Sequence, residues 1–148
     1  MVATKFLARD LLVEVLDPAS GGDYVEILGV ESLTHSPSST LANTTDFASQ
    51  GRMESIMAER GDEITMSGFR MEDVATGDRD PGQAIVEAIG QEISVASIGT
   101  FRITSPGGDS VVFGATVEAT LFGGGHNDPS AWGAKLTVSG AFAFNAGS

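Results

Sequence analysis

The chain has no cysteine and few basic residues, and these two shortages exclude several classes of function. Without cysteine, disulfide scaffolds, zinc fingers, iron–sulfur sites and thiol catalysis are excluded. Lysine and arginine together count 8, against 20 aspartates and glutamates, so the formal net charge of the 148 residues is −12. A surface of that charge repels nucleic-acid phosphates and anionic lipid, so we expect neither to be bound.

Long apolar runs are missing as well. No stretch approaches the run of about 18 apolar residues that indicates a membrane-spanning helix. The segment Met1–Leu7 lacks an apolar run long enough for a secretory signal, so we expect folding and assembly in a cytoplasm. Charged residues make up 19% and glycine counts 19, a mixture typical of turn-rich β structure. At this length, we expect one domain over residues 1–148.

Alternation near the C-terminus predicts two half-buried strands. Apolar or small side chains occupy every second position from Phe113 to Leu121 and from Ala134 to Phe144, with mostly small or polar residues between them. Shorter patterns predict further strands, with a bend at Gly99 in the last of them. These further strands are expected in segments 11–16, 24–33, 64–69 and 93–104.

The segment Ser105–Ser110 has the residues of a tight turn. Pro106 fixes φ at the second turn position, and Gly107 tolerates the positive φ that a type II turn needs next. We therefore expect a β-hairpin here.

One helix is predicted between Asp80 and Gly90. Asp80 suits the N-cap, Pro81 suits the first helical position, and Gly90 suits a left-handed end. A short helix with one apolar stripe packs on a sheet. The stripe is expected to contain Ala84, Ile85, Ala88 and Ile89.

Polar, turn-rich segments complete the chain. We expect a long polar loop over residues 36–62, in which 53–60 fits either a helix or a distorted strand, and a flexible loop over 123–130. A flexible N-terminal arm (1–9) and a C-terminal tail (145–148) are also expected; each either makes subunit contacts or is simply disordered. The sequence thus predicts a mostly β (α+β) fold, an antiparallel β-sandwich or barrel of roughly seven to nine strands with one short flanking α-helix.

No constellation of residues indicates catalysis. His35 and His126 lie in segments rich in small and turn-forming residues and have no partner at metal-ligand spacing. The glycines at 123–125 precede neither a helix nor a lysine, and the acids of segment 73–80 do not fit a calcium loop. We expect no catalytic residue, no cofactor and no metal ion. A carboxylate pair for glycoside hydrolysis stays open, because spacing alone does not exclude it.

Several short segments occur in an order that resembles the tail tube proteins (major tail proteins) of long-tailed, non-contractile bacteriophages. The resemblance extends over residues 25–144, and departs from the family pattern where Met53 stands in place of an aromatic residue. The segments that carry it are Thr44–Gly51, Glu63–Gly68, the helix at 80–89, Val111–Val117, Asn127–Ser130 and Ala134–Phe142.

This resemblance implies a β-sandwich flanked by a helix, assembled into hexameric rings that stack into a hollow tube. DNA would pass through the lumen without specific binding, and the acidic composition agrees because it repels phosphate. The implied location is the virion, and the implied partners are further copies, the tape measure, the tail tip and the terminator.

The long segment 36–62 is expected to reach a neighbouring ring and to order on contact. Open strand edges would pair between subunits and close the ring. The expected subunit interface contains Thr45, Asp46, Phe47, Met53, Ile56, Asn127 and Trp132.

Other functions stay open at this point. A tail terminator, an adaptor or a secretion-tube relative would form single rings and stop there. A carbohydrate-binding β-sandwich would use exposed aromatic residues such as Trp132 or Tyr24. A small acidic hydrolase is a further alternative.

Overall fold

The computed structural model describes residues 3–146, so the ends of the expected N-terminal arm and C-terminal tail (1–2 and 147–148) lie outside the described residues. The described chain is mostly β with one short flanking α-helix, which confirms the expected fold class. The strands are β1 (Leu12–Leu16), β2 (Tyr24–Glu26), β3 (Val30–Asn43), β4 (Ser55–Phe69), β5 (Ile98–Thr104), β6 (Ser110–Thr120) and β7 (Ala131–Asn145). The helix is α1 (Pro81–Gly90), and short 3-10 turns are η1 (Ala8–Asp10), η2 (Phe47–Ser49) and η3 (Ser94–Ser97).

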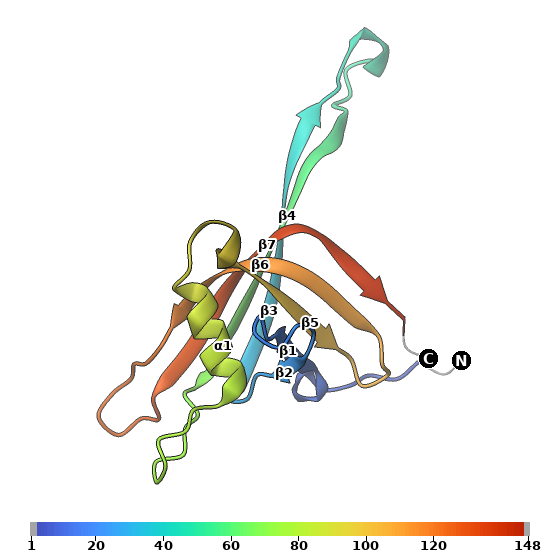
Figure 1. Cartoon of the computed structure of the whole chain (residues 1–148). Coiled ribbons are helices and arrows are strands. Elements are labelled where there is room, and N and C mark those ends of the chain that lie inside the picture. Colours follow the sequence, from blue (N-terminus) through green and yellow to red (C-terminus); the bar gives the residue numbers. More distant parts are fainter. Residues whose placement is uncertain (1–2, 147–148) are drawn as a thin grey trace.

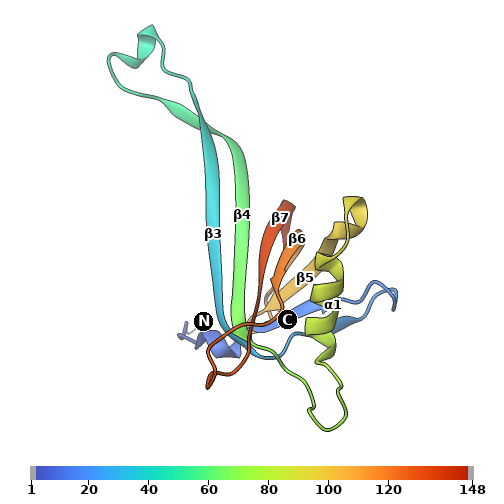
Figure 2. The same cartoon turned by 90° about the vertical axis from the view of Figure 1, so that its left-hand side faces the viewer.

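All seven strands belong to one antiparallel sheet in the order β2-β1-β5-β6-β7-β4-β3. The sheet curls strongly (Figure 1), and β5, β1 and β2 lie on one side of the central pair β6–β7 while the long strands β4 and β3 lie on the other (Figure 2). The expected sandwich or barrel is thus realised as a single curled sheet with a short strand and a long strand at its edges.

The helix covers part of the apolar face of this sheet. Its N-cap is Asp80, whose carboxylate accepts a hydrogen bond from the Gln83 backbone N–H, as predicted. The core beneath it combines two fully buried aromatic residues, Trp132 and Phe101, with further apolar side chains of β1, β4, β6 and β7. Gly99 lets the helix lie close to β5, because a Cβ there would lie 2.8 Å from the Ile89 Cδ1 atom.

Two details of the predicted helix are wrong. Gly90 is the last helical residue and has no positive φ, so it does not end the helix in a left-handed conformation. Gln91 after it has right-handed backbone geometry (φ −92°) and bonds back to the last turn. Of the predicted stripe, Ile89 is buried and Ile85 packs partly buried against the core, but Ala88 is exposed, and the buried face also includes Gln83 and Val86. The face differs because the polar Gln83 takes an inward position.

The hairpin between β5 and β6 is confirmed, but its turn differs from the predicted type. The Gly108 N–H donates to the Ser105 carbonyl over 3.0 Å, and the positive φ, 100°, falls on Gly108 rather than Gly107. This geometry is typical of a turn followed by a glycine bulge. Residues 94–97 form η3, so the strand begins at Ile98 and not at residue 93.

The expected loop over residues 36–62 is instead the outer part of a long β-hairpin, here called the hairpin arm. β3 and β4 pair along their lengths, and β4 pairs with β7 over Glu63–Phe69. Residues 55–62, about 26 Å of strand at about 3.3 Å per residue, therefore extend past the body of the sheet (Figure 2). The strand alternative for residues 53–60 is thereby confirmed from Ser55 onward.

Candidate assembly interface

The tip of the hairpin arm, residues 44–54, is a folded turn and not a loose loop. The Thr45 hydroxyl accepts a hydrogen bond from the Glu54 N–H over 2.8 Å, which joins the two ends of the tip. The Asp46 backbone N–H donates to the Ser49 hydroxyl at the start of η2. Gln50 then adopts a left-handed conformation with φ of 52°. Polar residues therefore give the tip its shape and leave its apolar side chains free.

Those apolar side chains lie in solvent. Phe47 is fully exposed, Met53 is 88% exposed and Ile56 is 62% exposed. Leu41, on the opposite strand, is 59% exposed. A two-stranded ribbon without a third strand is marginally stable in water, and exposed apolar clusters indicate an interaction surface. The arm thus has the features of a segment that packs against another molecule.

The seven predicted interface residues do not gather at one place. Five of them lie on the hairpin arm; Asn127 is exposed on the loop between β6 and β7, at the other end of the molecule (Figure 1). Trp132 is 1% exposed and lies in the core, so the expectation that it is an exposed loop residue is wrong. The strand β7 begins at Ala131, three residues before the predicted start at Ala134, and the Trp132 side chain within it is turned inward.

A groove that the sequence did not reveal lies beside the base of the arm. It has a volume of about 920 Å³, and its walls are mainly apolar side chains of β6, β7 and the arm. Phe113 and Phe142 meet edge to face on its floor, with ring centroids 5.4 Å apart. His35 lies on β3 and not in a loop; it contacts Phe142 and bonds to Asp62 over 2.8 Å. In the sequence, the feature that could have indicated this surface is the alternation of Phe142 and Phe144 at the end of the last predicted strand.

The opposite face of β6, β7, β4 and β3 is almost entirely polar. Cross-strand register aligns three rows of small or polar residues there, and we call these rows the polar face. Its formal charge is −1, from Glu63 and Glu118 against Lys135, whose ammonium lies 3.6 Å from Glu63. The rows are Thr116–Thr137–Glu63–Ser36, Glu118–Lys135–Thr65–Thr34 and Thr120–Gly133–Ser67–Ser32.

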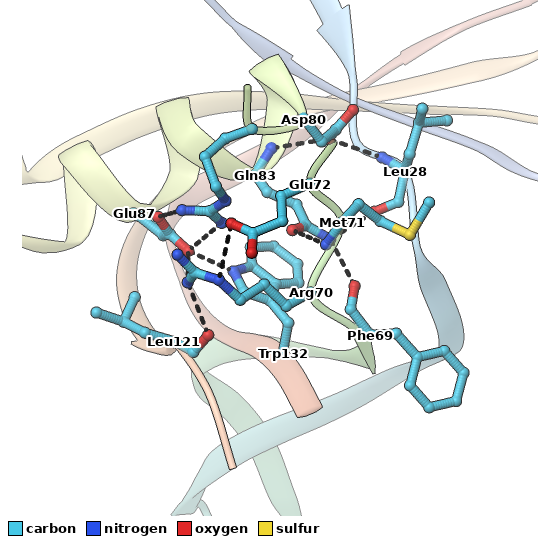
Figure 3. A network of polar contacts seen from close by, with 11 residues as sticks. Leu28, Phe69, Arg70, Met71, Glu72, Asp80, Gln83, Glu87, Leu121 and Trp132 are labelled. Carbon is cyan, nitrogen blue, oxygen red and sulfur yellow. Dashed lines mark hydrogen bonds and ion pairs between the residues drawn. The ribbon is translucent and has the colours of Figure 1, made fainter. Parts of the chain in front are cut away.

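The helix is fixed to the sheet by a group of ion pairs around Glu87 (Figure 3). Arg79 binds both Glu87 oxygens, at 2.7 and 2.9 Å, and the Trp132 indole N–H donates to the same carboxylate over 2.9 Å. Arg70 lies 3.6 Å from it. The group joins α1, the segment before it and β7, so it stabilises the body of the protein.

These contacts set the charge states within the group. Burial alone would raise the pKa of Glu87, but hydrogen bonds from Arg79 and Trp132, together with the charges of Arg79 and Arg70, outweigh burial and lower that pKa. The hydrogen bond to Glu87 raises the pKa of Arg79. Both groups are therefore held in their charged forms.

Tyr24 and Trp132, the aromatic residues expected to be exposed for carbohydrate binding, are both covered at least in part. The Tyr24 ring is covered by the Arg102 guanidinium, 4.0 Å from its centroid, and Arg102 also binds Glu14 over 2.9 Å. Arg102 therefore occupies one face of the Tyr24 ring, and Trp132 is buried. Within residues 3–146, no cluster of three or more acidic or histidine side chains could hold a metal ion. The same residues contain no helix with the length and apolarity to span a membrane.

Comparison with known proteins finds similarity in structure only. No protein-family model and no curated protein matches the chain. A chain in the tail of an empty gene transfer agent particle, determined with helical refinement and C6 symmetry, aligns with a TM-score of 0.71 at 21% identity, over 96% of this chain and 100% of the other. A chain in the native gene transfer agent virion gives a TM-score of 0.68 at 21% identity, with the same coverage.

A more distant likeness is to a baseplate chain. A chain in the six-fold symmetrised baseplate of an anti-feeding prophage aligns with a TM-score of 0.62 at 9% identity, over 97% of each chain. These alignments extend over nearly the whole chain, so the curled sheet with its helix and hairpin is the same fold as that of chains found in phage-like tails and baseplates.

Proposed function

We propose that this chain is a structural subunit of a phage-like tail, in which copies form hexameric rings that stack into a tube. The observation that carries this proposal is the full-length likeness to a chain in a gene transfer agent tail. The tape measure, the tail tip and the terminator are the other expected partners, and the virion is the expected location. DNA passes through the lumen without specific binding.

The polar face is the surface that best suits the lumen. It belongs to the four longest strands of the sheet, and its rows consist of hydroxyl, glycine and a few charged side chains. It has one lysine, whose charge Glu63 and Glu118 more than balance. A conduit must not hold its cargo, and a surface without clustered basic or aromatic groups offers DNA neither ion pairs nor stacking platforms.

The hairpin arm is the segment that best suits contact between rings. It projects from the body, and its tip exposes Phe47 and Met53 almost completely. Packing these side chains against an adjacent ring would remove them from water and fix the ribbon. The strand edges β2 and β3 would pair with neighbours in the same ring, which removes the unpaired backbone groups of an open sheet.

Negative-stain electron microscopy of the purified protein, concentrated at low and at high salt, tests this proposal. Stacked rings that form hollow tubes of open-ended length are the expected result. Monomers at every concentration, also after addition of preformed tail-tip complexes, would overturn it. Isolated rings would favour a second candidate, a terminator or adaptor, which the likeness to a baseplate chain supports.

A further inference from the structure

The loop after α1 presents apolar side chains to solvent in a shape that is costly to form. Ile93 is 83% exposed and Val95 is 82% exposed, and Ile98 follows at 44%. Between them Ser94 has φ of +63°, a left-handed conformation that residues other than glycine rarely adopt. The Ser97 hydroxyl donates to the Ser94 carbonyl and holds the turn. Residues 93–98 are here called the apical loop.

A second apolar surface lies where β3 begins and β4 ends. Leu28, Phe69 and Met71 are 45%, 40% and 41% exposed, and Phe122 is 70% exposed. We call these four residues the basal patch. In Figure 3 the Leu28, Phe69 and Met71 side chains all point away from the ion pairs around Glu87, toward the same side.

Buried hydrogen bonds hold the basal patch in place. The Gln83 side-chain amide is fully buried; it donates to the Leu28 and Phe69 carbonyls and accepts from the Met71 N–H, at 2.8, 2.8 and 3.0 Å. Phe122, two residues beyond β6, lies at the same end of the sheet, because Ala131, the cross-strand partner of Phe69, donates its N–H to the Gly123 carbonyl over 2.8 Å. The patch is therefore a preformed surface.

The two surfaces lie at opposite ends of α1. The Leu28 N–H donates to Asp80, the N-cap of the helix, while the C-terminal end of the helix leads directly into the apical loop. Ten helical residues separate the ends by about 15 Å. Both views place the apical loop on the side of the body from which the hairpin arm projects (Figures 1 and 2).

We propose that the apical loop of one copy packs on the basal patch of a copy in the adjacent ring. This inference rests on the proposed function, since it requires rings that stack in one direction. A repeated head-to-tail contact joins two different surfaces of the same chain, and here both surfaces are apolar and lie at opposite ends of α1. The hairpin arm and the apical loop leave the same end, so both meet the ring beyond it. The partner is thus a second copy of this chain.

Cross-linking between introduced cysteines tests the contact directly, because the native chain has none. A chain that carries both Val95→Cys and Phe122→Cys is assembled and oxidised, then examined on denaturing gels without reductant. We expect a ladder of covalent multimers. The matched control pairs Val95→Cys with Ala19→Cys, on the exposed turn between β1 and β2, and is expected to stay monomeric. An equal ladder from both pairs, or no ladder from the first, would overturn the inference.

Polar substitution separates this inference from the proposed function. The double variant Ile93→Ser with Val95→Ser changes two exposed side chains, so circular dichroism should report an intact fold. It is expected to need about tenfold more protein than the unchanged chain to form tubes, since it loses apolar burial at every ring junction. The control is Val74→Ser, at an exposed position outside both surfaces. If the unchanged chain forms tubes and the double variant does so equally well, the apical contact is wrong while the tube proposal stands. If the unchanged chain forms no tubes even after addition of preformed tail-tip complexes, the tube proposal is wrong and the apical contact with it.

Discussion

The hairpin arm and the helix-covered half of the sheet belong to one sheet but are stabilised in different ways. Around α1, Trp132 is 1% exposed and Glu87 makes several charged hydrogen bonds within the chain. Along the arm, two strands have water on both faces, and Phe47 is fully exposed. In the helix-covered region, side chains pack on and bond to other side chains of the same chain. Along the arm, exposed apolar side chains have no such packing partners among the described residues.

We infer from this difference that the body stabilises the fold and that the arm serves assembly. Apolar burial stabilises a fold only where it exceeds the entropy lost on ordering the chain, and the body achieves this without help. The arm buries little, so its ordering depends on what it contacts. We therefore expect substitutions in the body to change folding, and substitutions in the arm to change assembly.

The largest effect should come from Trp132→Ala. This change removes the largest fully buried side chain and leaves a cavity, with an expected loss of about 3–5 kcal/mol in the free energy of unfolding. Thermal denaturation followed by circular dichroism measures it. The matched control is Phe47→Ala, whose midpoint should stay close to that of the unchanged chain. Equal destabilisation by the two variants would show that the arm is part of the folding unit.

A smaller loss is expected from Glu87→Gln, about 1–3 kcal/mol, because Arg79 and Arg70 would lose their charged partner. The pH dependence identifies the cause. The folded state lowers the pKa of Glu87, so its contribution is complete above its ordinary pKa of 4.5 and disappears as pH falls through the lower folded value. The stability difference between the two chains should therefore be constant at neutral pH and shrink in acid. A difference that grows on acidification would contradict this assignment.

Substitutions in the hairpin arm should instead change the protein concentration needed for assembly. The double variant Phe47→Ser with Met53→Ser is expected to change the free energy of unfolding by less than about 0.5 kcal/mol, because both side chains are exposed. Tube formation, measured by sedimentation, should need at least about tenfold more protein. Trypsin provides an independent readout: Arg52 and Arg60 on the arm should be cut quickly in the free subunit and slowly in tubes. Equal cleavage rates would show that the arm stays in solvent after assembly.

The two regions also differ in how well the sequence predicts them. The alternation that predicts β6 and β7 is clear because one face of each strand is buried, and the Asp80 cap is a local signal that needs no tertiary information. The arm shows no such alternation in its polar half, since water covers both faces from Ser36 to Thr40. Length and polarity alone therefore suggested a loop where the chain forms a ribbon.

The exposed apolar residues of the arm tip are visible in the sequence, whereas the burial of Trp132 is not. Residues of the arm tip stand out because Phe47 and Met53 are apolar within a polar segment. The glycine-rich flank of Trp132 suggests a loop, while Glu87, which accepts its indole N–H, is distant in sequence. Predicting the polar face requires the register of four strands, and that register is not visible in any one segment of the sequence.

Salt should have the smallest effect of these changes on the protein concentration needed for tubes. Each subunit carries −12, so neighbouring copies repel one another, and salt shortens the range of that repulsion from about 10 Å at 0.1 M to about 3 Å at 1 M. Raising the ionic strength should therefore promote tubes by a few-fold in the protein concentration required. The apolar contacts of the arm do not depend on screening, so the arm variant should shift by the same factor as the unchanged chain. Tubes that dissolve as salt approaches about 0.5 M would show instead that attractive ion pairs between subunits outweigh the net repulsion.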